Sequence, residues 1–127
     1  MDRLGSRSIQ RAMAALWMCG LFLLPAFGGE LHRAARAGDV ARLKELLDAG
    51  ASPNERDSLG GSPLHDAAWA GEDDAAALLI ARGADVNARH TEGGSTPLHY
   101  GTITNHPSMV ALLLAKGADL HARYRSG

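Results

Sequence analysis

Apolar residues fall in short clusters along the chain, and the longer clusters span residues 40–47, 76–80 and 110–114. Within them, apolar residues recur three and four positions apart, which places them on one face of a helix. A shorter apolar cluster precedes each longer one. The pattern therefore predicts three pairs of short helices, in which the second helix of each pair has a buried stripe. The residues expected in these stripes are Val40, Leu43, Leu46, Leu47, Ala76, Leu78, Leu79, Ile80, Val110, Leu112, Leu113 and Leu114.

The three helix pairs recur at a nearly fixed period. The dipeptide Leu-His occurs at 31–32, 64–65 and 98–99, so successive copies are 33 and 34 residues apart. A period of this size indicates stacked repeats, each of which is one supersecondary unit. The longer step is explained by one extra residue between Asn87 and Pro97, in a loop where it leaves the helices unchanged.

Signals for helix starts and stops recur with the same period. Ser62-Pro63 and Thr96-Pro97 each supply an N-cap hydroxyl and a proline at the first helical position. Gly38, Gly71 and Asn105 are equivalent, and these residue types most readily adopt the left-handed conformation after a helix. We therefore expect the first helix of each pair to stop there. A second set of aligned glycines is expected to end the second helices: Gly50, Gly83 and Gly117.

The third copy departs from the others inside its first helix. Ala34 and Ala67 are equivalent small residues that let helices of adjacent units approach closely, and Gly101 takes their place in the third copy. Glycine in a helix interior costs about 0.8–1.0 kcal/mol relative to alanine. We therefore expect Gly101 to weaken this helix and Gly101→Ala to stabilise the protein.

All these features combine in the segment DSLGGSPLHDAAWAGEDDAAALLIARGADVNA, residues 57–88. Its D-x-x-G turn, its S-P-L-H helix start, its apolar second helix and its closing G-A-D-V-N-A together resemble the ankyrin repeat. The resemblance covers residues 29–127 as three copies, approximately 29–57, 58–90 and 91–123. It implies an all-α solenoid of helix-turn-helix units joined by β-hairpin-like loops. The departures are the missing Thr-Pro before Leu31, and Thr91, Gly101, Asn105 and His121 in the third copy.

The resemblance also implies a function, because ankyrin domains bind protein partners on the concave face through hairpin tips and exposed positions of the first helices. The equivalent positions here, with the charged residues beside them, are Arg36, Ser58, Leu59, Asp66, Trp69, Ala70, Glu92, Ser95, Ile103 and Thr104. Trp69, Ile103 and Leu59 would form an apolar patch on which Trp69 is a candidate anchor for a partner. The alternative is that Trp69 packs on a neighbouring side chain and bolsters the stack.

The six histidines invite a metal or catalytic hypothesis, which the repeat argues against. His32, His65 and His99 occupy equivalent positions, and packed helices lie about 8–10 Å apart, too far for three imidazoles to share an ion at about 2 Å each. In the ankyrin family this histidine hydrogen-bonds nearby backbone, which is a structural task. We therefore expect no metal, no cofactor and no active site of an enzyme. The remaining histidines are expected to be solvated: His90, His106 and His121.

Composition and charge fit this interpretation. The chain has 127 residues, of which 46% are hydrophobic and 21% are charged, and its formal net charge is −1. These values suit one soluble globular domain. The sequence has no basic run, so nothing in it favours a nucleic-acid partner.

The first 28 residues differ from the repeats and predict a secretory signal peptide. Arg3, Arg7 and Arg11 form a basic start, and an uncharged run of residues follows at 12–27. This run is short for a membrane span of about 20 residues, and the small residues near Gly28 suit cleavage after that position. Cleavage would leave a cysteine-free, periplasmic or secreted chain with no membrane contact. The alternative is an uncleaved inner-membrane anchor.

Together these features predict an exported, non-enzymatic ankyrin-repeat protein that binds an unidentified protein partner. Two alternatives stay open: a secreted effector that acts on host proteins, and a small hydrolase or metal-dependent enzyme on the same scaffold. Residues 124–127 align with the start of a fourth repeat. We therefore expect either a truncated sequence or an exposed end that self-associates.

Overall fold

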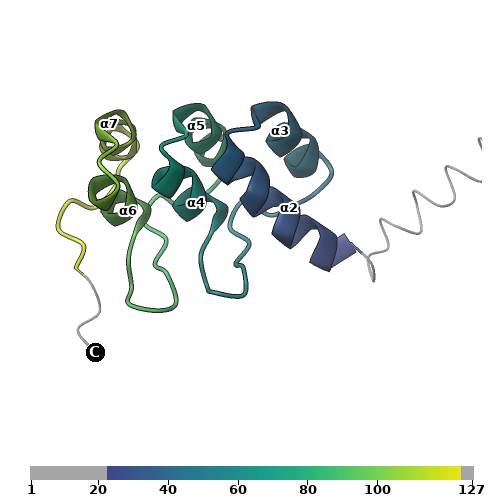
Figure 1. Ribbon diagram of the computed structural model, residues 1–127, viewed down its shortest axis with the longest axis horizontal. Helices are drawn as coiled ribbons and strands as arrows, with labels where there is room; N and C mark the ends of the chain where they lie inside the picture. Colours follow the sequence, from purple (N-terminus) through teal and green to yellow (C-terminus); the bar gives the residue numbers. More distant parts are fainter. Residues whose placement is uncertain (1–22, 124–127) are drawn as a thin grey trace, which may run out of the picture.

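A computed structural model of the chain describes the backbone of residues 23–123 and the side chains of residues 29–123. Within these residues it contains six helices and no strand. Figure 1 shows α2, α4 and α6 in one row and α3, α5 and α7 in a second row, with the loops after α3 and α5 projecting beyond the first row. This arrangement confirms the all-α solenoid. The helices are α2 (Leu23–Ala37), α3 (Val40–Asp48), α4 (Pro63–Ala70), α5 (Asp73–Ala81), α6 (Pro97–Ile103) and α7 (Pro107–Ala115).

Helices α4 and α6 start through the same reciprocal cap, as the sequence predicts. The Ser62 hydroxyl accepts a hydrogen bond from the backbone N–H of His65, and His65 Nδ1 accepts one from the Ser62 N–H at 3.1 Å. Thr96 and His99 repeat both bonds at the start of α6. Each cap satisfies backbone donors that the first helical turn leaves without a partner.

The first helix of each pair ends at a left-handed residue, which confirms the predicted stops. The φ angle is 68° at Gly38, 74° at Gly71 and 58° at Asn105. Among the described residues, Asn105 is the only one other than glycine with a positive φ. Because asparagine tolerates this conformation better than most residues, the third copy keeps the turn without glycine.

Aligned leucines form the centre of the core in every repeat. Each is at most 6% exposed. Burial of one leucine side chain contributes roughly 1.5–3 kcal/mol, so these short helices are held mainly by packing between rows and between repeats. The six leucines are Leu31, Leu43, Leu64, Leu79, Leu98 and Leu113.

The buried stripe of α7 differs from the prediction. Leu114 is 39% exposed, whereas Met109 is fully buried. The reason is geometric: consecutive helical residues are rotated by about 100°, so three consecutive leucines cannot share one face. Met109 lies one helical turn before the buried Leu113 and therefore fills the core instead. Other predicted stripe residues are only partly buried: Val40, Leu78, Ile80, Val110 and Leu112.

A ladder of polar contacts joins the loops of neighbouring repeats. Asn54 Nδ2 donates to the Gly83 carbonyl at 2.9 Å, and Asn54 Oδ1 accepts from the Asp85 N–H at 2.7 Å. Asn87 makes the same two bonds one repeat later. The loops thus tie each repeat to the next independently of the apolar core.

Helix α2 begins at Leu23 and crosses the position after Gly28 where the sequence predicts cleavage. Residues 1–22, which hold most of the predicted signal peptide, and residues 124–127, which hold the predicted start of a fourth repeat, lie outside the described residues. Among the residues described, no helix has the length and apolar character needed to cross a membrane.

Candidate functional site

Three histidines join the first helices to the loop of the following repeat. The Nε2 atom of each lies within hydrogen-bonding distance of a backbone carbonyl about 30 residues ahead or less. Because a carbonyl only accepts, each Nε2 carries the proton and donates it. The predicted structural role of these histidines is confirmed, and the bonds also connect one repeat to the next. The pairs are His32 with Gly61 (3.0 Å), His65 with Ser95 (2.9 Å) and His99 with Ala122 (2.8 Å).

A cavity of about 260 Å³ lies beside these bonds, where the first helices meet the two projecting loops. Its walls come from α2, α4 and α6 and from the loops that precede α4 and α6. Small-molecule pockets usually enclose roughly 300–1,000 Å³, so this cavity is sized for a single side chain. The lining residues are Arg36, Asp57, Leu59, Gly61, His65, Asp66, Trp69, His90 and Tyr100.

An ion pair forms one side of the cavity. Arg36 Nη2 donates to Asp66 Oδ1 at 2.5 Å, and this hydrogen bond, with the charge of Asp66, raises the pKa of Arg36. The Arg36 side chain is 65% exposed and is therefore free to move on the surface side. Asp66 is 8% exposed, and its second oxygen, Oδ2, is buried without a hydrogen-bond partner among the described residues. The carboxylate of Asp66 thus has unused capacity to accept hydrogen bonds.

A second carboxylate, that of Asp57, approaches from the loop before α4. Its Oδ1 accepts hydrogen bonds from the N–H groups of Leu59 and Gly61, both at 2.9 Å. Burial acts to raise the pKa of Asp57, but these bonds and the nearby His32 and His90 outweigh it, so the pKa is lowered. Asp57 is therefore ionised at neutral pH and adds a negative charge to the cavity.

Aromatic rings form the opposite side of the cavity. The ring centroids of Trp69 and Tyr100 are 5.6 Å apart in an edge-to-face arrangement, and those of His65 and Tyr100 are 5.2 Å apart. Burial, and then the charges of His90 and Arg56, lower the pKa of His65 to about 4, although its hydrogen bond to Ser95 acts in the other direction. The His65 ring is therefore neutral at pH 7 and behaves as part of the aromatic wall.

Two equivalent contacts between neighbouring repeats line the cavity, one an ion pair and the other an aromatic pair. Arg36 and Trp69 stand five residues after the aligned leucine of their repeats, and Asp66 and Tyr100 stand two residues after it. The fifth position contacts the second position of the next repeat in both cases, as an ion pair and then as an aromatic pair. These four side chains line the cavity, which is therefore charged on one side and aromatic on the other.

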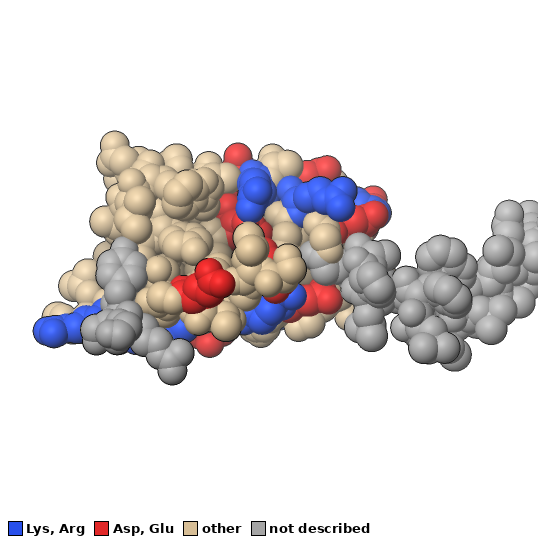
Figure 2. All heavy atoms as spheres, turned by 60° about the horizontal axis from the view of Figure 1, so that its bottom comes forward, with Lys and Arg blue, Asp and Glu red and all other residues tan. Residues whose placement is uncertain are grey.

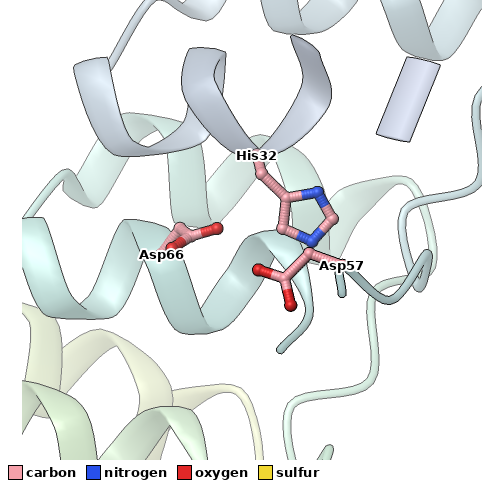
Figure 3. A group of neighbouring side chains, drawn as sticks. All are labelled: His32, Asp57 and Asp66. Carbon is pink, nitrogen blue, oxygen red and sulfur yellow. The ribbon is translucent and has the colours of Figure 1, made fainter. Parts of the chain in front are cut away.

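Three residues, of which Asp57 and Asp66 line the cavity, meet a geometric condition for binding a metal ion. One ligand atom each from His32, Asp57 and Asp66 lies within 4.8 Å of the other two, and Figure 3 shows the three side chains gathered together. Two contacts oppose a bare cation. His32 Nε2 donates its proton to Gly61, which leaves only Nδ1 of that ring as a possible ligand, and Arg36 already brings a positive charge to Asp66. The carboxylates of Asp57 and Asp66 are better suited to a cation that donates hydrogen bonds.

The structure brings together four of the ten predicted contact residues: Arg36, Leu59, Asp66 and Trp69. Leu59 is 67% exposed and Trp69 is 51% exposed, so both are accessible at the rim. Ile103 is 59% exposed on α6 but does not line the cavity. The predicted apolar patch is therefore only partly assembled around the cavity.

The other predicted contact residues lie outside the cavity lining. Ser58 and Glu92 are exposed, whereas Ala70, Ser95 and Thr104 are partly buried. The Thr104 hydroxyl donates to the carbonyl of Tyr100 at 2.7 Å and so has a local structural role. Their contact with a partner stays a prediction.

Sequence reasoning missed several residues of the site and misjudged one. Tyr100 occupies the position equivalent to Asp66, and this equivalence could have identified it. His90 is not simply solvated as predicted, because it is partly buried and its ring lies 5.7 Å from that of His65. Its backbone N–H bonds the carbonyl of Ser95, as the N–H of Asp57 bonds Gly61, so His90 takes the place of Asp57 in the longer loop. The substitution of a histidine for the aspartate concealed this role.

Charge is distributed unevenly around the cavity. Figure 2 shows that charged side chains gather over the α2–α3 end of the visible face, whereas the surface over α6 and α7 is largely uncharged. The ion pair and Asp57 belong to the charged end, and Trp69 and Tyr100 face the uncharged end. The cavity therefore lies between a charged surface and a largely uncharged one.

Comparison with known families gives a match over most of the repeats. A family model described as ankyrin repeats, in three copies, matches residues 31–124. This range contains all the residues that line the cavity and all the described helices from within α2 onwards.

Similar segments occur in otherwise different proteins. The chain is 43% identical over 68 residues to the 2-5A-dependent ribonuclease of Mus musculus, which is 53% of this chain and 9% of that protein. It is 42% identical over 69 residues to a putative ankyrin repeat protein of Fowlpox virus, covering 54% and 17%. It is 40% identical over 65 residues to an ankyrin repeat-containing protein of Schizosaccharomyces pombe, covering 51% and 31%. The chain thus spans less than a third of the length of each of these relatives.

Proposed function

Since this chain belongs to the ankyrin-repeat family, whose repeats are generally protein–protein interaction modules, we propose that it binds a protein partner through the cavity and the exposed side chains at its rim. The observation that supports this most directly is the exposure of Trp69 beside Leu59 at the mouth of a preformed cavity. Tryptophan is one of the residue types that are enriched in binding hot spots. Trp69 keeps this exposure although its ring also packs edge-to-face on Tyr100.

We propose that the role is non-enzymatic. His65, which lines the cavity, and the equivalent His32 each donate a proton to a backbone carbonyl, which suits a structural bond rather than proton transfer. The hydroxyl of Ser62 lies 2.8 Å from His65 Nδ1, but it is buried and accepts the backbone N–H of His65, which suits a helix cap rather than a nucleophile.

The binding proposal is tested by site-specific photocrosslinking followed by a measured affinity. A photoreactive amino acid at Leu59 should capture a protein that the same group at the exposed Lys44 of α3 does not capture. The captured protein is then purified and its affinity for the full chain is measured. Equal capture at both positions would contradict binding at the cavity.

Replacement of Trp69 then separates binding from folding. We expect Trp69→Ala to weaken the affinity for the purified partner by at least about 2 kcal/mol, because truncation removes the anchor. We expect the loss of unfolding free energy to be well below the roughly 3–5 kcal/mol typical of a core tryptophan, because Trp69 is half exposed. Leu114→Ala is the control, since Leu114 is an exposed leucine on the other row of helices. A large loss of stability with unchanged affinity would make Trp69 a packing residue.

We also propose that the protein is exported and cleaved near Gly28, on the sequence of residues 1–28. Cleavage there would remove the part of α2 that precedes Gly29 and keep Leu31 and the residues that line the cavity. Intact-mass analysis of the protein from a cell that exports it should give a chain starting near Gly29. A full-length chain in the membrane fraction would favour the anchor instead.

A further inference from the structure

Aspartate side chains outnumber arginine side chains in the lining of the cavity. The carboxylates of Asp57 and Asp66 line the cavity, and the guanidinium of Arg36 balances one of their two negative charges. The carboxylates contribute atoms that lie within 4.8 Å of each other, an arrangement that repulsion disfavours unless a cation is close. Arg36 makes a single hydrogen bond to Oδ1 of Asp66 and interacts with Asp57 through charge. The local charge is therefore negative, because the His65 ring is neutral at pH 7.

The separation of the two carboxylates suits one donor group between them. Two acceptors that each lie about 2.9 Å from one nitrogen can be up to about 5.8 Å apart. The limit of 4.8 Å between the ligand atoms of Asp57 and Asp66 falls inside this range. A planar group with several N–H donors could therefore contact both carboxylates at once.

The aromatic side of the cavity favours the same kind of group. Trp69 and Tyr100 are held against each other, and Trp69 remains half exposed. Aromatic faces attract cations, and they attract the flat, weakly hydrated guanidinium better than the compact, strongly hydrated ammonium of lysine. The contact between Arg36 and Asp66 shows that a guanidinium is accommodated at this edge of the cavity.

We propose that the cavity receives the side chain of an arginine from the protein partner, with its guanidinium between Asp57 and Asp66 and its plane against the aromatic side formed by Trp69 and Tyr100. This inference rests on the proposed function and specifies the partner: its binding segment presents an exposed arginine. Because Oδ2 of Asp66 is buried, the incoming guanidinium takes the place of Arg36 on Oδ1, and Arg36, whose side chain is 65% exposed, moves aside.

The test uses the full chain and blocked tripeptides as probes. Acetyl-Gly-Arg-Gly-amide is titrated into ¹⁵N-labelled protein, with the citrulline, lysine and aspartate tripeptides as comparisons. Citrulline has nearly the shape of arginine without its charge. We expect the arginine peptide to shift the indole N–H signal of Trp69 and the amide signals of Leu59 and Gly61, and to bind at least about fivefold more tightly than any comparison peptide. Equal binding of the citrulline peptide, preference for the aspartate peptide, or no shift at all would overturn the proposal.

A charge-neutral variant supplies the second arm. Asp66→Asn should weaken binding of the arginine peptide by at least about fivefold. Asp48→Asn is the matched control, because Asp48 also pairs with an arginine, Arg82, but lies on α3 away from the cavity. Equal effects of the two variants would contradict the proposal. The wild-type comparison of arginine with citrulline decides the question even where Asp66→Asn does not fold.

The outcome is distinguishable from failure of the proposed function. If the arginine peptide does not bind preferentially while Trp69→Ala still weakens binding of the purified partner, the cavity binds protein by another chemistry. Only the inference about arginine is then contradicted. If both fail, the interface lies elsewhere on the solenoid.

Discussion

His65 shows how one side chain can start a helix and join two repeats. Its Nδ1 accepts from the Ser62 N–H, and its Nε2 donates to the Ser95 carbonyl of the next loop. Both bonds need the neutral imidazole, with one nitrogen as acceptor and the other as donor. Burial, the largest cause, lowers the pKa of His65 to about 4, which keeps this form at physiological pH.

The free energy of unfolding should therefore decrease as the pH is lowered from about 6.5 to about 4. An unfolded histidine has a pKa of about 6.5, so between pH 6.5 and about 4 the unfolded chain binds a proton that folded His65 does not. The stability contributed by His65 is fully present above pH 6.5 and is lost as the pH falls toward 4, by roughly 3 kcal/mol in all. Asp57, whose pKa is also lowered, contributes its loss at more acidic pH.

Urea unfolding of the full chain at pH 7.0 and pH 4.5 measures this effect. His65→Gln should lower stability at pH 7 but should flatten the difference between the two pH values. His121→Gln is the control, because it makes the same replacement at an exposed position outside the bonds of His65 to Ser62 and Ser95. An undiminished pH dependence in His65→Gln would show that another group is responsible.

The residue scale also shows what the sequence could and could not predict. The caps and the left-handed stop at Asn105 followed from local rules, because each depends on neighbours within a few residues, whereas the structural role of the histidines came from the resemblance to the ankyrin repeat. The cavity could not be predicted from local rules. Its residues Tyr100, Asp57 and His90 come together with Trp69 and Asp66 only after neighbouring repeats stack. Their pairing depends on the repeat register, and the register could have revealed Tyr100 from the position of Asp66.

At the scale of elements, the contact between α6 and α7 differs from its counterpart in the second repeat. Gly101 faces Met109, and a Cβ added at Gly101 would lie 3.3 Å from Met109 Cγ. The equivalent residues of the second repeat are Ala67 and Ala75, both fully buried. The third repeat therefore combines a smaller residue on one helix with a larger residue on the other. The expectation that Gly101 merely weakens its helix left out this exchange of volume.

Gly101→Ala should therefore stabilise the protein by less than the helix propensity alone provides. Alanine gains about 0.8–1.0 kcal/mol in the helix, but Met109 must give way by a few tenths of an ångström, which offsets part of this gain. In a Met109→Ala background the full gain should appear. Chemical unfolding of the four proteins of this double-mutant cycle should give a coupling energy of at least about 0.5 kcal/mol. Additive effects would mean that the two side chains do not compete for space.

At the scale of the whole molecule, the solenoid depends on two kinds of contact between repeats. The apolar core joins α2 to α4 and α4 to α6, and α3 to α5 and α5 to α7. The asparagine ladder joins the loops, through Asn54 between the first and second repeats and Asn87 between the second and third. Because each repeat touches only its neighbours, loss of one junction should act mainly on the repeat that it holds.

Hydrogen exchange can locate these losses. Asn87→Ala removes two hydrogen bonds to the turn after α7, so amides of α6 and α7 should exchange about tenfold faster, while α2 and α3 change little. Asn54→Ala should do the reverse, because it loosens the first repeat from the second. Ser52→Ala is the control, since the Ser52 hydroxyl accepts only from the Asn54 N–H within its own loop. If instead both asparagine variants accelerate exchange uniformly, the three repeats unfold as one unit and the junctions are not independent. That result would also bear on binding, because the cavity draws its walls from all three repeats and would then open only when the whole stack does.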